Sequence, residues 1–383
     1  MNKKISLGFA ISLVAIASAV TFILTSFFSL QSFNKKFEKY DSLQEIDTLV
    51  HENFYGDIDE NDINNGILKG YISGLNDKYS RYLTADEYTD EKSDNAGEMT
   101  GLGITVKKDD SGYIKVTEIM PDSPASESDI KIDDLIVSVN GNDVLETGFE
   151  KSMEIMSEKD NTEVSIIVRR DGVDKTYTLT RRPIEMVTVT GEMLDNYIGY
   201  IKISGFKQNT PQQFNDALDE IIQNGAKGII FDLRENGGGL VDALEDCLDP
   251  LLPEGTIATA EYSDGNSKTI VYSDKSEINI PMVVIVNEHT ASAAELFAAS
   301  LKDFGKADIV GETTYGKGVM QSTMELSNGG AVVLTIAKYK TTNSECYDGI
   351  GITPDYIVQN EDEDDDDDQY NKALEVITQK IEN

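Results

Sequence analysis

The chain has 383 residues, of which 39% are hydrophobic, so it is long enough for two or three domains with cores of their own. It carries 69 acidic residues against 33 basic ones, which gives a formal net charge of −36 at pH 7. This charge argues against nucleic acid as a partner and against binding of the soluble part to anionic membrane surfaces, because phosphates would be repelled.

The sequence predicts no metal and no cofactor. Two histidines, His51 and His289, and two cysteines, Cys247 and Cys346, have none of the spacings of a zinc site. The acidic run Glu361–Asp368 follows no calcium-loop pattern and is interpreted as a solvated loop. Both cysteines are interpreted as ordinary buried residues, and a disulfide between them outside the cell stays open as the alternative.

An uncharged segment from Ile5 to Leu30 is the first feature in chain order. As a helix it would span about 39 Å, which is enough to cross a bilayer. The small residues Ala15–Ala19 lie in its middle with a further apolar run after them, so an uncleaved signal anchor over residues 1–33 is favoured over a cleaved signal peptide. The chain would then be a single-pass protein of the cell membrane with its bulk outside the cytoplasm, although lysines after the span oppose the positive-inside rule.

Residues 34–96 are predicted to form a helical N-terminal region. Apolar residues recur at helical spacing from Leu43 to Val50 and again from Ile63 to Tyr71. The run Gly74–Leu83 then breaks this pattern.

A glycine-containing loop, Gly101-Leu102-Gly103-Ile104, opens the next region. The patterns of Val116–Pro124 and Asp133–Gly141 follow it in an order that resembles a PDZ domain over residues 97–183. The resemblance implies that backbone N–H groups of this loop bind the C-terminal carboxylate of a peptide, which pairs with the following strand. Three apolar residues at helical spacing either line the peptide groove or belong to the core: Phe149, Met153 and Met156.

Residues 184–383 alternate strand and helix patterns, which predicts an α/β domain. The expected strands are Ile198–Ile203, Gly228–Leu233, Met282–Val286, one near Asp308, and Val332–Tyr339. The expected helices are one capped by Thr210-Pro211 and ending at Gly225, Leu240–Leu251, one from Ser292 to Gly305 with one apolar face, and Tyr370–Ile381.

A serine, a lysine and a glutamine in this domain have the spacing of a nucleophilic site. Ser292 opens a helix, where unpaired N–H groups and the helix dipole can stabilise an oxyanion. Lys317 lies 25 positions later between two glycines, and Gln321 follows it. A serine needs a base to take its proton, and a lysine serves if burial keeps it neutral. Gln321 can orient the amine without adding a charge, whereas an acid would hold the amine protonated.

A glycine turn that follows the strand Gly228–Leu233 is the candidate source of a second oxyanion donor. The N–H of Gly238 or of Gly239 would bind the oxyanion together with the N–H of Ala293. The sequence does not determine which of the two glycines does so. Glu295 is interpreted as favourable to the helix dipole and receives no catalytic role. His289 is interpreted as a turn residue, because it lies too close in sequence to Ser292 to serve as its base.

Together, these motifs resemble those of the C-terminal processing (tail-specific) peptidases, which are PDZ-containing serine proteases of the S41 type. The resemblance covers about residues 40–380. It implies a crotonase-like α/β catalytic core with an inserted PDZ domain, beside the helical N-terminal region and the transmembrane helix. It also implies protein or peptide substrates with apolar C-termini and a PDZ domain that gates the site. In the family, the corresponding glycine turn usually has a proline at the position that Gly237 occupies in this chain.

Two interpretations of the N-terminal region stay open. The run Gly74–Leu83 resembles a Leu-Asp-Pro-Tyr-Ser segment of the family, whose N-terminal region helps to form homodimers. The alternative is a helical spacer above the membrane.

Two other functions stay open from the sequence. The chain could be a PDZ scaffold that binds C-termini without cutting them, although Ser292, Lys317 and Gln321 count against this. It could also be an acyl-CoA enzyme, because crotonase-like folds host such enzymes, although the membrane segment and the PDZ domain oppose that reading.

Overall fold

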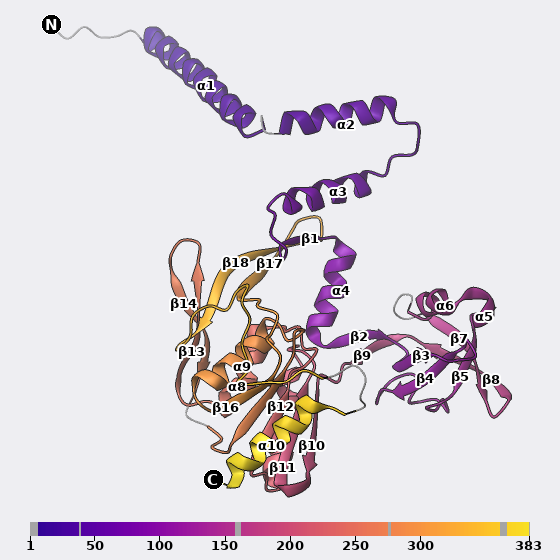
Figure 1. Cartoon of the computed structure of the whole chain (residues 1–383). Helices are drawn as coiled ribbons and strands as arrows, with labels where there is room; N and C mark the ends of the chain where they lie inside the picture. Colours follow the sequence, from indigo (N-terminus) through magenta and orange to yellow (C-terminus); the bar gives the residue numbers. More distant parts are fainter. Residues whose placement is uncertain (1–6, 38–39, 158–161, 275–276, 361–365, 383) are drawn as a thin grey trace. The chain divides into compact units, whose positions relative to one another are not determined.

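The computed structural model describes residues 7–37, 40–157, 162–274, 277–360 and 366–382, and the chain forms two compact units (Figure 1). Residues 1–70 belong to the first unit and residues 71–383 to the second. This boundary lies inside the predicted region 34–96, so the last part of that region belongs with the larger unit. Most of the acidic run, residues 361–365, lies outside the described residues.

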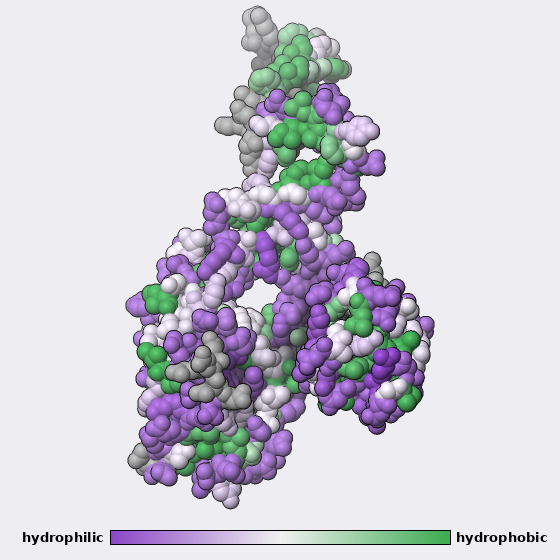
Figure 2. Space-filling model, turned by 45° about the vertical axis from the view of Figure 1, so that its right-hand side comes forward, coloured by the Kyte–Doolittle hydropathy of each residue, from purple (hydrophilic) through white to green (hydrophobic). Residues whose placement is uncertain are grey.

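The first unit is helical, as predicted. Its helices are α1 (Leu7–Phe37), α2 (Asp41–Asn53) and α3 (Glu60–Ser73, which ends in the second unit). The stretch Ile11–Phe28 of α1 is long and apolar enough to cross a membrane, and none of it is buried. Figure 2 shows hydrophobic residues gathered over these helices. Between α2 and α3 lies a cavity of about 500 Å³ with a largely apolar lining.

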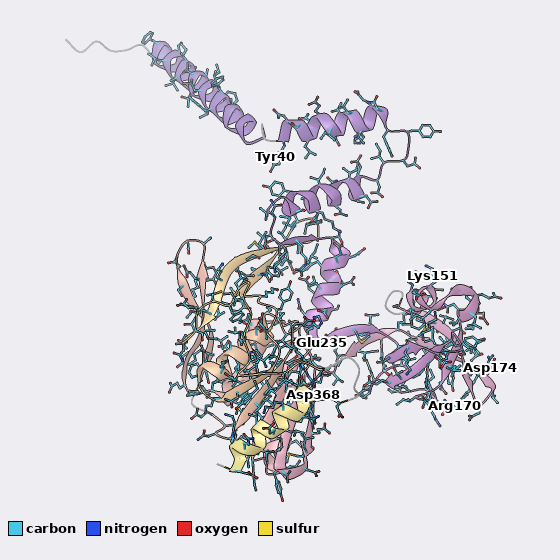
Figure 3. The ribbon with its side chains drawn as sticks, in the orientation of Figure 1. Tyr40, Lys151, Arg170, Asp174, Glu235 and Asp368 are labelled. Atoms are coloured by element: carbon cyan, nitrogen blue, oxygen red, sulfur yellow. The ribbon has the colours of Figure 1, made fainter. Side chains whose placement is uncertain are left out.

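The predicted PDZ region begins and ends in a two-stranded sheet of β2 (Glu98–Gly101) and β9 (Arg182–Glu185). Between them lies a sheet of order β3-β4-β5-β7-β8, with β6 paired to β5. Arg170 of β7 pairs with the buried Asp134 at 2.6 Å, and Arg169 pairs with Asp174 of β8 at 2.7 Å. Figure 3 labels Arg170 and Asp174 in this region. The elements are β3 (Ile104–Lys108), β4 (Ile114–Ile119), β5 (Leu135–Val139), β6 (Asn142–Asp143), α5 (Val144–Thr147), α6 (Phe149–Met156), β7 (Glu163–Arg170) and β8 (Val173–Thr180).

The rest of the second unit is built around a sheet of order β10-β11-β12-β15-β16-β19, parallel except for β10. Strand residues alternate between its faces. Ile230 and Val283 pack against α10 on one face, whereas Phe231 and Val284 pack toward α7, α8 and α9 on the other. The elements are β10 (Val189–Leu194), β11 (Ile198–Ile203), α7 (Thr210–Gln223), β12 (Gly228–Asp232), α8 (Val241–Leu248), β15 (Met282–Val286), α9 (Ala293–Asp303), β16 (Ala307–Gly311), β19 (Tyr356–Ile357) and α10 (Asp368–Glu382).

A second, largely antiparallel sheet packs against α8 and α9. Its long strand β18 (Ala331–Thr341) pairs with β17 (Val319–Glu325), and also with β1 (Arg81–Leu83) and β13 (Gly255–Tyr262). Strand β14 (Ser267–Ser273) completes it, and α4 (Ala85–Ala96) follows β1. The sequence predicts β18 but not β1, β13, β14 or β17, which are short or have mixed polarity.

One predicted helix is covered more fully than expected, and one predicted helix cap is wrong. Every residue of α9 from Ala293 to Leu301 is buried, so this helix is covered on all sides and not only over the expected apolar face. Its small alanines let neighbouring elements approach closely on each side. The N-cap of α7 is Asn209, one residue before the predicted Thr210-Pro211 cap. The buried Thr210 hydroxyl instead accepts the Lys207 N–H and donates to the carbonyl of Gly205.

Candidate active site

Ser292 lies where the chain leaves β15, passes through a polar turn and enters α9. Its backbone has φ 57° and ψ −120°, a conformation that L residues rarely adopt. Such a conformation costs about 1–3 kcal/mol and persists only where surrounding contacts fix it. As the N-cap of α9, Ser292 precedes Ala293, whose N–H donates to no acceptor among the described residues.

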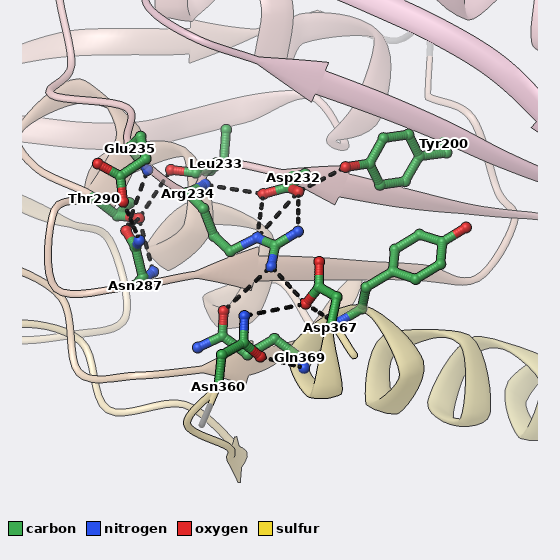
Figure 4. Close-up of polar contacts among 11 residues, drawn as sticks. Tyr200, Asp232, Leu233, Arg234, Glu235, Asn287, Thr290, Asn360, Asp367 and Gln369 are labelled. Carbon is green, nitrogen blue, oxygen red and sulfur yellow. Dashed lines mark hydrogen bonds and ion pairs between the residues drawn. The ribbon is translucent and has the colours of Figure 1, made fainter. Parts of the chain in front are cut away.

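The turn before Ser292 is tied to the chain that leaves the neighbouring strand β12. Thr290 Oγ1 donates to the carbonyl of Leu233 at 2.9 Å, and Asn287 Nδ2 donates to Glu235 Oε1 at 2.7 Å (Figure 4). The Glu235 N–H donates back to Asn287 Oδ1 at 3.2 Å. Because these bonds join the loops after two adjacent parallel strands, they hold the serine turn beside the glycine turn.

A buried asparagine shapes the glycine turn. Asn236 Nδ2 donates to the carbonyl of Ile203 at 2.8 Å, and Asn236 Oδ1 accepts the N–H of Gly238 at 2.8 Å. The carbonyl of Asn236 accepts the N–H of Ala291 at 2.9 Å, one residue before Ser292. The N–H of Gly238 is therefore already used inside the protein.

The two candidate glycines face different surroundings. Gly238 is buried at φ 100°, and a Cβ there would lie 2.8 Å from the Ala291 carbonyl oxygen. Gly239 is exposed and lines the same cavity as Ser292. Within the described part of the chain, the Gly239 N–H donates to no other group. Of the two candidate glycines, Gly239 is therefore the one whose N–H remains available at this cavity, where the Ala293 N–H is also available.

An ion-pair network fixes the direction in which the chain leaves β12. Asp232 is fully buried and accepts hydrogen bonds from Tyr200 Oη at 2.6 Å and from the Arg234 guanidinium at 2.6 Å (Figure 4). Arg234 also pairs with Asp367, just before α10, at 2.7 Å. Burial alone would lower the pKa of Arg234, but these two carboxylates outweigh it and raise that pKa. The charge on Arg234 is thus permanent and anchors the segment that leads into the glycine turn.

Glu295 joins the serine and the lysine through their backbones. Its fully buried carboxylate accepts the N–H of Ser292 at 2.9 Å and the N–H of Lys317 at 2.8 Å on one oxygen. The other oxygen accepts the Thr314 hydroxyl at 2.5 Å and the Gly316 N–H at 2.7 Å. A carboxylate that accepts four hydrogen bonds is well compensated for its burial.

The loop that carries Lys317 is held on its other side by the second sheet. Tyr339 Oη donates to the Lys317 carbonyl at 2.6 Å, and the Tyr339 N–H donates to the carbonyl of Gly318 at 3.0 Å. A Cβ at Gly318 would lie 2.8 Å from the N of Asp348, which explains why glycine stands beside the lysine. Backbone hydrogen bonds on both sides therefore set the position of Lys317.

The environment of Lys317 lowers the pKa of its amine. Burial is the main cause that lowers the pKa of Lys317, and the charges of Arg81 and Lys78 lower it further. Glu295 and Asp77 act in the opposite direction. Within the described residues, the amine forms no ion pair with a carboxylate.

The predicted residues meet in one cavity of about 840 Å³. Its lining includes Ser292, Ala293, Gly239, Lys317 and Gln321, but not Gly238. Among the described atoms, no hydrogen bond joins the Ser292 hydroxyl to the Lys317 amine. Such catalytic contacts are often long before substrate binds.

Gln321 lies in strand β17, and its amide donates to Thr335 Oγ1 at 3.3 Å rather than to Lys317. His289 is an exposed turn residue beside Glu288, as the sequence suggests.

The loop Gly101–Ile104 belongs to the PDZ region and is not part of this cavity. Gly101 ends β2, and Ile104 begins β3, which is an edge strand with one side open for strand addition. The N–H groups of Leu102 and Gly103 donate to no other group among the residues described. Phe149 and Met153 are half-buried against the PDZ core, whereas Met156 belongs to that core.

The described residues contain no group of three histidine, cysteine or acidic side chains that could hold a metal ion. Cys247 and Cys346 are both free, so they do not form the alternative disulfide in this structure. Cys247 is buried as predicted, whereas Cys346 is only half-buried, with its thiol 3.6 Å from the carbonyl oxygen of Gly318.

Sequence reasoning missed Glu295 as a residue of the site. The available signal was a single acid within the run of alanines and apolar residues that opens α9. In a helix that is otherwise apolar, a carboxylate needs partners if the helix is buried. Those partners come from the lysine loop, which the sequence does not place next to α9.

The chain is similar to known proteases over most of its length. The sequence model of Peptidase family S41 matches residues 197–358, and that of the PDZ domain matches residues 100–180. The chain is 32% identical over 360 residues to the carboxy-terminal processing protease CtpA of Bacillus subtilis, an alignment that covers 92% of this chain and 77% of that protein. It is 31% identical over 324 residues to a carboxyl-terminal-processing protease of Synechocystis sp., covering 81% of this chain and 76% of that protein.

Solved structures agree with these relatives. The photosystem II D1 C-terminal processing protease matches with a TM-score of 0.50 and 26% identity, covering 83% of this chain and 86% of that chain. A Bacteroides fragilis protein described as an S41 protease matches with a TM-score of 0.55 and 16% identity, covering 85% of this chain and 91% of that chain. At that identity the second match shows the fold alone.

Replacing Glu295 tests its role in holding the site together. In Glu295→Gln, an NH₂ group replaces a carboxylate oxygen that accepts hydrogen bonds in the parent. Donors would then face a donor, so we expect the free energy of unfolding to fall by about 3 kcal/mol. We also expect cleavage to fall at least about a hundredfold, because Ser292 and Lys317 lose their common anchor. Initial cleavage rates and urea unfolding check both effects. The control is Glu288→Gln, an exposed acid nearby. Cleavage within about threefold of the parent would contradict the role of Glu295.

Proposed function

The chain belongs to Peptidase family S41, and we propose that it is a membrane-anchored endopeptidase that acts outside the cytoplasm through a Ser292–Lys317 dyad. It is a serine protease of the carboxyl-terminal processing type. One observation carries the proposed dyad: a single buried carboxylate, that of Glu295, binds the backbones of Ser292 and Lys317, and both side chains line one cavity.

Ser292 Oγ attacks the scissile carbonyl carbon while the Lys317 amine takes the hydroxyl proton. The carbonyl electron pair moves to oxygen, and the N–H groups of Ala293 and Gly239 hold the resulting oxyanion. Gly239 is preferred to Gly238 because the Gly238 N–H is already bonded to Asn236. Collapse of the intermediate breaks the C–N bond, and Lys317 returns its proton to the leaving amine. Water then attacks the acyl-enzyme with Lys317 as base and restores the serine.

Gln321 is the proposed orienting residue for Lys317. Its amide lies in the same cavity and is bonded to Thr335 at 3.3 Å, the long end of the hydrogen-bond range. A change of side-chain rotamer would release this bond and let Gln321 Oε1 accept an N–H of the amine when substrate binds. The layering of a parallel sheet between helices supports the further proposal that the catalytic core is crotonase-like.

The dyad predicts the pH dependence of cleavage. The ammonium form of Lys317 cannot accept a proton, so kcat/KM should rise about tenfold per pH unit below the pKa of Lys317 and then level off. Because burial lowers that pKa, the plateau should begin below the ordinary lysine range. Mass spectrometry of an unfolded protein with an apolar C-terminus measures the rates across pH.

The Ser292→Ala and Lys317→Ala variants supply the controls for this experiment. Both should lose cleavage while they keep the circular dichroism of the parent. Equal cleavage by all three proteins would refute the dyad. Binding of the unfolded protein without cleavage by the parent would favour the PDZ scaffold instead.

The PDZ region is proposed to select substrates by their C-termini. The open edge of β3 and the unused N–H groups of Leu102 and Gly103 support a peptide that adds a strand and places its carboxylate at the loop. Half-buried Ile104, Val106 and Met153 favour an apolar last residue. By analogy with the family, occupation of this groove also opens the catalytic site.

Blocking the substrate C-terminus tests this selection. A C-terminal amide removes hydrogen bonds to a charged carboxylate, each worth about 1.5–3 kcal/mol, so KM should rise about tenfold or more. If the groove also gates the site, kcat should fall as well. Steady-state kinetics with matched free and amidated substrates measure both constants. Identical kinetics for the two substrates would contradict both C-terminal selection by the PDZ region and its gating of the catalytic site.

The membrane anchor and a homodimer complete the proposal. Helix α1 supports the anchor, and the apolar cavity between α2 and α3 supports a second copy as its occupant. The full chain should float with lipid vesicles in a density gradient, whereas residues 34–383 alone should remain at the bottom as a dimer by light scattering. A full chain that does not float with the vesicles would contradict the anchor. A monomer in light scattering would contradict the dimer.

A further inference from the structure

A segment that precedes the PDZ region reaches the catalytic lysine. The ring centroid of Tyr79 lies 4.8 Å from Lys317 Nζ. Tyr79 is separated from Lys317 by the whole PDZ region and lies outside residues 197–358, which match the peptidase family. Both residues belong to the same compact unit, so the contact is internal to it.

Tyr79 is held in place by the second sheet. Strand β1, which begins two residues later, pairs with β18 so that Arg81 lies opposite Val333. Just before β1, Ser80 Oγ accepts the N–H of Thr335 at 3.1 Å, and Asp77 accepts the N–H of Tyr79 at 3.3 Å. The same strand β18 carries Tyr339, which bonds the Lys317 carbonyl. Tyr79 and Lys317 are therefore fixed by one strand.

Charged and titratable groups reach Lys317 from each element packed around it. The segment before β1 contributes Asp77 and Lys78, β1 contributes Arg81, and α9 contributes Glu295. Strand β18 contributes Tyr339, and the following loop contributes Asp348, which accepts the N–H of Gly318 at 3.2 Å. No carboxylate among the described residues bonds the amine itself, whereas the Tyr79 ring lies against it.

Two opposing effects of an aromatic ring on an ammonium group decide what Tyr79 does. Attraction between the ring face and the cation favours the charged form by about 0.5–2 kcal/mol. Exclusion of water disfavours the charged form, and the effective penalty for a buried ion is several kcal/mol. Burial is the main cause that lowers the pKa of Lys317, so we take water exclusion as the larger effect at this half-buried amine.

We propose that Tyr79 is a positioning residue for the proteolytic reaction, whose ring holds the Lys317 amine at the cavity and keeps water away from it. The inference rests on the proposed role of Lys317 as the base. The Tyr79 hydroxyl is buried without a partner at hydrogen-bond geometry among the described residues, and the Lys78 amine also lies 4.7 Å from the ring centroid, so we assign the effect to the ring. The proposed active site thus includes a contribution from a residue outside residues 197–358, the segment that matches the peptidase family.

Opening this side of Lys317 should make the amine more basic. In Tyr79→Ala water reaches the amine, so the pKa of Lys317 should rise, and cleavage at neutral pH should fall about tenfold for each unit of that rise. The rate at high pH should recover toward that of the parent. Tyr79→Phe keeps the ring and should retain the parent pH profile. Tyr88→Leu is the control, because Tyr88 also lies against a lysine, with Lys92 Nζ at 4.3 Å from its ring centroid, and its hydroxyl bonds Glu325 rather than a residue that shifts the pKa of Lys317.

The experiment uses two measurements on the full chain. The first is the pH profile of kcat/KM for an unfolded protein with an apolar C-terminus. The second is the pKa of Lys317 itself, obtained in a Ser292→Ala background from the pH dependence of its acetylation by trace acetic anhydride, read by mass spectrometry. This second reading needs no catalytic activity. Tyr79→Gln, which fills part of the space but brings a polar group, replaces Tyr79→Ala if the alanine variant does not fold.

The outcomes distinguish the role of Tyr79 from the role of Lys317 as the base. A raised Lys317 pKa together with a matching shift of the pH profile in Tyr79→Ala, and neither change in Tyr79→Phe or Tyr88→Leu, supports the positioning role. An unchanged or lowered Lys317 pKa in Tyr79→Ala overturns it, even if cleavage is lost. Full cleavage by Lys317→Ala overturns the proposed dyad instead, whatever the Tyr79 variants do.

Discussion

The buried carboxylate of Glu295 is the constraint on which the rest of the site depends. It lies in the first turn of α9 and binds the backbone N–H groups of both Ser292 and Lys317. An ionised group at full burial is tolerated only when hydrogen bonds replace its water, and here four donors do so. The same bonds set the relative position of Ser292 and Lys317, the proposed nucleophile and base. The carboxylate acts on the backbone and forms no ion pair with the lysine amine among the residues described, so it positions Lys317 without a direct contact that would hold it protonated.

The sheet explains why these loops can be held so closely. Strands β12 and β15 are parallel neighbours, so their carboxyl ends meet at one edge. The glycine turn follows one strand and the serine turn follows the other, and Asn287, Thr290 and Asn236 bond the two loops together. The strained backbone of Ser292 is stable in this setting because contacts on both sides determine it. The carboxyl edge of a parallel sheet is where α/β proteins commonly place their ligands.

The lysine comes to the site from a different layer. Its loop leads into β17, and strand β18 beside it holds the Lys317 carbonyl through Tyr339. The same strand pairs with β1, which places Tyr79 against the amine. The cavity that Ser292 and Lys317 line therefore lies between two sheets, and the residues around the Lys317 amine come from segments on both sides of the PDZ region.

The sequence by itself determined the parts whose physical signal is local. Alternating and continuous apolar runs gave the buried strands β11, β12 and β15 within a residue, and a serine after an apolar strand with small residues behind it indicated the helix start. Spacing and glycine flanks likewise singled out Lys317, because backbone geometry near a glycine is a local property. Only the tertiary structure decided which glycine N–H remains available, why Glu295 is buried, and that Tyr79 lies against Lys317. Those facts depend on contacts between residues far apart in the chain, whose partners no local pattern specifies.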